Sequence, residues 1–186
     1  ERAIVCSGAD FESLYPDIFA HSGLTRCKLQ MLRTAPQPDD WRLGPMLAGG
    51  LTLRHYTAFK ECQSLAAYAC RITAEHPEFD DWGIHVMASQ NGRGEITIGD
   101  SHEYGWSIDP FDKPEIDRWI LDYLQTFLAA PSLHIAQRWH GIYAKHPDRA
   151  DFIADPAPGV KIVNGVSGAG MTTAFGLAEE VFAAWE

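Results

Sequence analysis

The sequence has little positive charge for its length. Its 186 residues include 15 lysines and arginines against 25 aspartates and glutamates, a formal net charge of -10. Because nucleic-acid affinity rests mainly on clustered basic side chains, this balance argues against a general nucleic-acid-binding protein. A local basic pocket for a small anion is compatible with it.

Paired cysteines, metal-binding motifs and long apolar runs are absent as well. The four cysteines, Cys6, Cys27, Cys62 and Cys70, include no CxxC pair and predict reduced, mostly buried thiols. The eight histidines show no HExxH or other metal-ligand spacing, so we expect no metal site. No apolar stretch approaches the roughly 18 residues of a membrane span, and no signal-peptide pattern is present. We therefore expect no membrane association and a cytoplasmic location.

Hydrophobic periodicity predicts the elements of an α+β protein. Strands are expected over residues 3–6, 25–34, 46–56, 84–90, 95–103, 135–145 and 160–164. Helices are expected over residues 10–21, 59–76, 114–128 and 171–185. The Asn91-Gly92-Arg93-Gly94 segment indicates a hairpin. The middle of the chain thus predicts a mainly antiparallel sheet with packed helices, while both ends belong to a different layer.

The two ends of the chain carry glycine turns next to apolar strands. Residues 3–6 form a continuous apolar run closed by Ser7-Gly8, which is typical of a strand buried on both faces. Such a strand usually follows another segment, so we expect a preceding part of the protein. Near the other end, residues 163–172 read as a strand, a glycine-rich turn and a helix. The amides of a helix start attract anions, although the glycines would also serve simply to turn a tight corner.

Three segments, in this order, resemble the D-amino-acid oxidase and glycine oxidase superfamily of flavoproteins. They are Ile4-Val5-Cys6-Ser7-Gly8-Ala9, Arg138-Trp139-His140-Gly141-Ile142-Tyr143, and the stretch from Gly165 to Thr172. The resemblance implies parts of a Rossmann-like FAD-binding domain at residues 1–24 and 141–186, around a substrate-binding domain at residues 25–140. It implies FAD contacts from Cys6, Ser7, Gly8, Ser167, Gly168, Ala169, Gly170, Met171 and Thr172.

The resemblance also implies that a segment is missing. The family opens with a strand–GxGxxG–helix unit that grips the FAD pyrophosphate, and this sequence contains none. We therefore expect the chain to need an N-terminal FAD-binding segment as its partner. By itself it should carry no FAD and should be inactive.

The substrate side departs from the amino-acid oxidases of the family. Their Trp-x-Gly-x-Arg strand supplies an arginine for the substrate carboxylate, and the matching residue here is Tyr143. A second such arginine, found in glycine oxidase, falls on Gly168. Residues 51–56 and 99–104 resemble a subgroup linked to aminophosphonate breakdown. This implies a phosphonate site built by Arg54, His102, Tyr143 and Lys145.

Each of these four residues has a simpler interpretation. Arg54 would be a solvated strand-edge residue and His102 a surface neighbour of Glu103. Tyr143 would only pack in a core, and Lys145 would be exposed. The leading hypothesis is hydride transfer to FAD from a small amine or amino-acid-like substrate. A substrate like 2-aminoethylphosphonate comes first, and a generic amino acid or sarcosine-type substrate comes second. The alternative is a non-catalytic module that binds a small anion.

Overall fold

The computed structural model describes residues 1–185, and in it the chain divides into two compact units. The first unit contains residues 1–27, 104–108 and 142–186, and the second contains residues 28–103 and 109–141. Each unit has its own hydrophobic core. Among the residues described, no helix combines the length and the apolar character that crossing a membrane requires.

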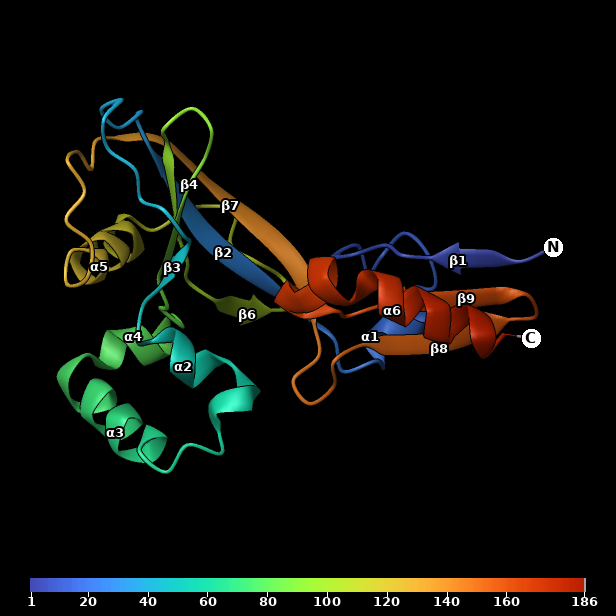
Figure 1. Cartoon of the computed structure of the whole chain (residues 1–186). Coiled ribbons are helices and arrows are strands. Elements are labelled where there is room, and N and C mark those ends of the chain that lie inside the picture. Colours follow the sequence, from blue (N-terminus) through green and yellow to red (C-terminus); the bar gives the residue numbers. More distant parts are fainter. Residues whose placement is uncertain (186) are drawn as a thin grey trace. The chain divides into compact units, whose positions relative to one another are not determined.

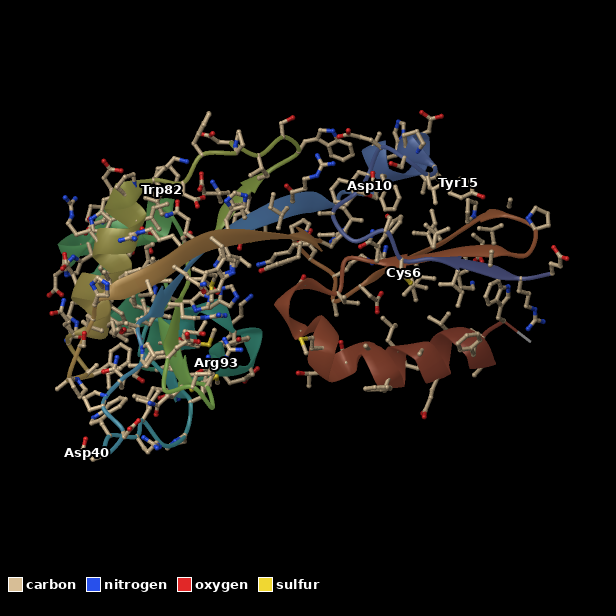
Figure 2. All side chains as sticks on the ribbon, turned by 90° about the horizontal axis from the view of Figure 1, so that it is seen from above. Cys6, Asp10, Tyr15, Asp40, Trp82 and Arg93 are labelled. Carbon is tan, nitrogen blue, oxygen red and sulfur yellow. The ribbon has the colours of Figure 1, made fainter. Side chains whose placement is uncertain are left out.

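One sheet contains most of the strands. Its order is β3 (Leu47–Ala48), β4 (Met87–Gln90), β5 (Ile96–Gly99), β2 (Thr25–Thr34) and β6 (Glu103–Gly105), and β7 (Ile135–Lys145) also pairs with β2. The β3–β4, β4–β5 and β2–β5 pairs are antiparallel. The Asn91–Gly94 hairpin is confirmed: Arg93, labelled in Figure 2, lies in the turn, and the Asn91 carboxamide oxygen accepts its N–H at 2.9 Å. The predicted mainly antiparallel α+β fold is therefore confirmed.

Helices of the second unit contribute to a common core with this sheet. They are α2 (Thr52–His55), α3 (Leu65–Glu75), α4 (Pro77–Asp81) and α5 (Pro114–Leu124), with a 3-10 turn at Thr57–Phe59. Ile72, Phe79, Ile116 and Ile120 lie buried in one cluster with Ile98 of the sheet. The two predicted amphipathic helices exist, but both are shorter than the apolar pattern suggested. The first begins only at Leu65.

The strand predicted over residues 46–56 is wrong beyond Ala48. After β3 the chain turns, and Thr52 begins helix α2. A Cβ on Gly49 would lie 2.7 Å from the Tyr123 ring, so only glycine fits against α5 here. The Leu51 N–H then donates to the Tyr123 hydroxyl at 3.0 Å. Contacts with a distant helix, which local alternation does not reveal, thus replace the strand by a turn.

The first unit contains a three-stranded sheet. β1 (Ala3–Val5) pairs parallel with β9 (Val160–Asn164), which pairs antiparallel with β8 (Phe152–Ala157). Figure 1 shows β1, β9 and helix α6 (Gly170–Ala183) running beside one another. The strands expected at residues 3–6 and 160–164, at the two ends of the chain, thus lie side by side in one sheet. Strand β8 was not predicted.

Other details of the first unit correct the sequence analysis. The helix expected over residues 10–21 is only α1 (Pro16–Ala20). Before it, the Asp10 carboxylate accepts the N–H groups of Glu12 and Ser13, and Tyr15 has a left-handed backbone, with φ of 55° (Figure 2). The local turn satisfies these amides, so a longer helix does not form there.

Burial also differs from the expectation at both ends. Ala3 and Ile4 of β1, the edge strand of its sheet, are exposed, so the expected burial of this strand on both faces is wrong. In α6 the buried residue is Val181, whereas Met171 of the predicted apolar stripe is 96% exposed. The cysteines differ too: Cys27 is buried, and Cys6, Cys62 and Cys70 are exposed.

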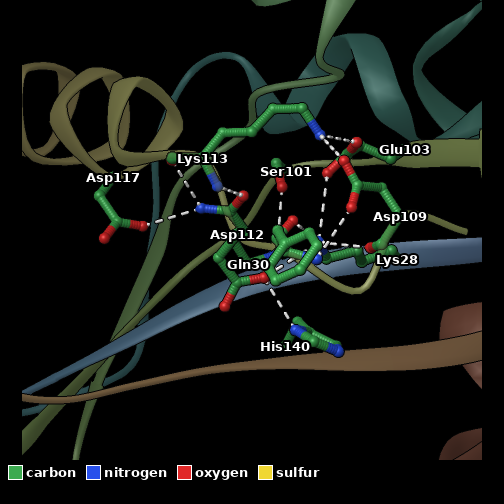
Figure 3. Close-up of polar contacts among 10 residues, drawn as sticks. Lys28, Gln30, Ser101, Glu103, Asp109, Asp112, Lys113, Asp117 and His140 are labelled. Atoms are coloured by element: carbon green, nitrogen blue, oxygen red, sulfur yellow. Dashed lines mark hydrogen bonds and ion pairs between the residues drawn. The ribbon is translucent and has the colours of Figure 1, made fainter.

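A buried lysine network holds the segment 109–117 against β2 (Figure 3). Lys28 is fully buried, and its Nζ lies 3.0 Å from the Asp112 carboxylate and donates to the carbonyl oxygens of Asp109 and Phe111. Gln30 donates to Asp117, whose pKa is raised by burial despite that bond. These partners supply hydrogen bonds and opposite charge to the Lys28 ammonium, whose burial without them would be costly.

Candidate functional site

The glycine-rich turn of the first unit follows β9 through two left-handed residues. Gly165 has φ of 69° and Ser167 has φ of 55°, and the 3-10 turn Ser167–Ala169 leads directly into α6. A Cβ on Gly165 would lie 2.7 Å from Leu24, so this corner requires glycine. Residues 167–172 are half-buried or exposed, which leaves the backbone of the helix start accessible to a bound group.

Asn164 joins this turn to the turn that follows β1. Its buried carboxamide donates to the Gly8 carbonyl at 2.9 Å and lies 3.4 Å from the Ser7 hydroxyl. Its oxygen accepts the Gly165 N–H at 2.7 Å. One side chain therefore fixes both of the segments that resemble FAD-contacting turns.

Two cavities adjoin these turns within the first unit. A mainly apolar cavity of about 330 Å³ is lined by Cys6, Gly8 and residues of α6. A second cavity of about 460 Å³ is lined by Ser167, Ala169 and Thr172. Gly168 and Gly170 belong to the same turn, whereas the Met171 side chain points into solvent.

Tyr143 and Lys145 come from the last part of β7 and lie near the same turn. A Cβ built on Gly168 would lie 3.9 Å from the Tyr143 hydroxyl oxygen. Lys145 forms a bridge with Val166, and its Nζ donates to the Tyr104 hydroxyl at 3.0 Å. Lys145 is half-buried, so its interpretation as simply exposed is wrong. Two predicted residues thus adjoin the glycine-rich turn.

Arg54 and His102 lie in the second unit. Arg54 belongs to α2 and forms an ion pair with Asp80, which also accepts a hydrogen bond from Thr73. Burial alone would raise the pKa of Asp80, but these two partners lower it below its ordinary value. His102 is 4% exposed, so its interpretation as a surface residue is wrong. The convergence of Arg54, His102, Tyr143 and Lys145 in one site stays a prediction.

Sequence reasoning missed the surroundings of His102. Its imidazole stacks on that of His55, with centroids 4.6 Å apart, and lies 4.8 Å from that of His85. The Asp100 carboxylate oxygen lies 3.1 Å from Nε2 of His85 and 3.7 Å from Nε2 of His102. Burial raises the pKa of Asp100 to about 7. No local spacing of histidines could have revealed this group, because His55, His85 and His102 come from segments far apart in the sequence.

A cavity of about 410 Å³ opens beside these histidines. Arg54, His55, Lys60, Asp80 and His85 contribute polar groups to its wall. The two positive side chains suit a small anion. The cavity lies wholly within the second unit.

The mixed α+β fold of the chain is one that a solved structure shares. It is similar to the crystal structure of L-proline dehydrogenase from P. horikoshii, with a TM-score of 0.60 and 20% sequence identity. The similarity covers 93% of this chain and 39% of that one, so the chain spans well under half of its length. No curated protein matches the chain.

The family follows from the sequence model that matches residues 1–184, described as FAD dependent oxidoreductase, or DAO. The chain belongs to this family. FAD is therefore the cofactor expected for it.

Proposed function

We propose that the chain is part of an enzyme that oxidises a small amine or amino-acid-like substrate by hydride transfer to FAD. The family match over residues 1–184 carries this proposal. FAD, when bound, supplies the hydride acceptor, while the protein supplies orientation and electrostatics. The alternative, a non-catalytic anion-binding module, has no comparable support.

We propose that the flavin ring binds at the glycine-rich turn of the first unit. Apart from its chain neighbours, the described atom nearest to a Cβ added on Gly168 is the Tyr143 hydroxyl oxygen, at 3.9 Å, so the backbone is little covered here. The start of α6, a helix of 14 residues, offers a positive dipole end there. We propose that this end stabilises negative charge beside it, and that the Asn164 carboxamide holds the Gly8 turn in place.

The substrate proposal is an aminophosphonate. Tyr143 and Gly168 occupy the positions where the amino-acid oxidases of the family are expected to carry carboxylate-binding arginines. The hydroxyl of Tyr143 donates a single bond without requiring a flat partner. Arg54, with His102 and Lys145, would offset the negative charge of a phosphonate, whose unpaired burial would cost several kcal/mol.

Flavin content tests the reaction class. The full-length gene product should purify with absorbance near about 450 nm, and an amine substrate should bleach this absorbance without oxygen. We propose that residues 1–186 alone bind FAD weakly, because no pyrophosphate-binding glycine motif is among them. A colourless full-length protein that binds phosphonate but does not turn it over would support the anion-binding module instead.

Arg54→Ala tests the substrate. In the full-length enzyme it should lower kcat/KM for 2-aminoethylphosphonate about 10- to 150-fold, or roughly 1.5–3 kcal/mol, and hardly alter turnover of an uncharged amine. Asp80→Asn is the matched control, since it breaks the same ion pair but keeps the guanidinium. If Arg54→Ala impairs both substrates equally, or Asp80→Asn reproduces its selectivity, Arg54 serves the fold and the phosphonate proposal fails.

A further inference from the structure

Three imidazoles of the second unit meet at one place, beside a carboxylate. His55, His85 and His102 each offer a ring nitrogen, and these three atoms all lie within 4.8 Å of one another. The Asp100 carboxylate oxygen adjoins two of the same rings through their Nε2 atoms. Neutral imidazole is a preferred ligand of zinc, copper, iron and nickel, and a carboxylate completes such a set.

The backbone positions this group closely. His85 and Asp100 exchange backbone hydrogen bonds of 2.7 and 3.2 Å, extending the β4–β5 ladder. The His102 N–H donates to the Trp82 carbonyl at 2.8 Å. Two of the histidines, His85 and His102, are each 4% exposed. His85, Asp100 and His102 are therefore held in place by backbone hydrogen bonds.

The tautomer of His102 suits a metal ligand. Its Nδ1 lies 3.2 Å from the Gly83 carbonyl oxygen, which can only accept, so Nδ1 carries the proton. The lone pair is then on Nε2, the atom that faces Asp100. A second ring nitrogen that donates to a carbonyl is the usual support of a metal-binding histidine.

We propose that His55, His85, His102 and Asp100 form a binding site for a divalent transition metal, with zinc as the best-suited ion. Metal–nitrogen distances of about 2.0–2.1 Å put tetrahedral ligand atoms roughly 3.4 Å apart, so the three imidazole nitrogens, now within 4.8 Å of one another, must approach by up to about 1.4 Å. His55 must also turn out of its parallel stack, because its lone pair lies in the ring plane. His55 is half-buried at the end of α2, and it is the ligand that can move most easily.

The site opens onto the 410 Å³ cavity through His55 and His85. A water or small anion could approach the metal as a fifth ligand from that side, where Arg54 and Lys60 contribute positive charge. This inference does not rest on the flavin reaction, because the metal affinity of the chain can be measured without FAD or substrate.

Zinc titration of the tag-free chain, followed by calorimetry after treatment with a chelator, tests the proposal. We expect one zinc per chain and a rise in Tm on binding. His55→Ala and His85→Ala should each weaken zinc binding at least about 10-fold, and Asp100→Asn about 10- to 100-fold. His134→Ala, which removes an exposed histidine of the same unit, should leave the affinity unchanged.

Folding is checked by circular dichroism of each metal-free variant. If His85→Ala fails to fold, the comparison of His55→Ala with His134→Ala decides, because His55 is the least buried of the three ligands. The proposal is overturned if the chain binds no zinc, or if His55→Ala and His134→Ala bind it equally well. If the chain binds zinc as expected but the full-length protein does not oxidise an amine with FAD, the result counts against the proposed function alone.

Discussion

The Asp100 carboxylate lies 3.1 Å from Nε2 of His85, and the two residues also pair through their backbones. This pairing sets a carboxylate beside an imidazole at the end of the β4–β5 hairpin. The residues packed around His85, Asp100 and His102 then determine which substitutions this group of side chains tolerates.

Gly83→Ala should disturb this cluster. Gly83 has φ of 53°, and an added Cβ would lie 2.8 Å from Cβ of His102. We expect a loss of about 1–3 kcal/mol in the free energy of unfolding, because strain and a clash occur together. Urea denaturation measures it. Gly92→Ala, where no atom lies within 4 Å, should change stability by less than about 0.5 kcal/mol. Equal effects of the two substitutions would contradict the close fit of Gly83.

Lys28→Met should destabilise the second unit strongly. The fully buried ammonium faces Asp112 at 3.0 Å and Glu103 at 3.8 Å, whose side chains are 33% and 13% exposed, and its removal leaves these carboxylates without their cation. Breaking a buried pair in this way costs about 3–5 kcal/mol. Thermal and urea unfolding of the variant should show it. The exposed Lys60→Met should be nearly neutral, and a similarly mild effect of Lys28→Met would mean that the network is replaceable by apolar packing.

Asn164→Ala should loosen the two turns of the first unit. It removes the hydrogen bonds to the Gly8 carbonyl and to the N–H of Gly165, which is buried. The expected loss is about 1–3 kcal/mol in the free energy of unfolding. Hydrogen exchange should quicken at residues 6–8 and 165–167. An exposed control, Gln125→Ala, should alter neither quantity. Unchanged exchange in Asn164→Ala would show that the strand pairing alone fixes the turns.

Asp80 should make stability depend on pH. Its pKa in the folded state is lowered by Thr73 and Arg54, so the folded form holds fewer protons than the unfolded form near that pKa. The stabilisation is present above the unfolded pKa of 3.8 and is lost as pH falls through the lower folded value. Because both side chains are partly exposed, Asp80→Asn should cost only about 0.5–1 kcal/mol at pH 7.

That cost should vanish once the pH falls below the folded-state pKa of Asp80, where the wild-type carboxylate is protonated too. Urea unfolding of both proteins across the acid range measures the difference. Asp122→Asn, at an exposed position, should track the wild type throughout. A difference that persists unchanged at low pH would show that the charge of Asp80 is not its cause.

The sequence alone determined the locally encoded elements. Asn91 and the two glycines that follow it specify the hairpin through their own turn geometry, so no distant contact is needed. The alternation of residues 25–34 and the apolar stripe of α5 likewise predict a strand and a helix, because burial of one face repeats at a fixed period. That β1 and β9 lie close together followed from family resemblance, and the structure shows that they pair in parallel.

Only the tertiary structure decided the rest. Residues 51–55 became helical because Gly49 and Leu51 meet Tyr123, a residue far along the chain. His55, His85 and His102 come together for the same kind of reason: they belong to α2, to the segment before β4 and to the segment after β5, which only the tertiary fold brings to one place. Periodicity records which face of an element is buried. It does not record which partner buries it, and the chemistry of the histidine cluster depends on that partner.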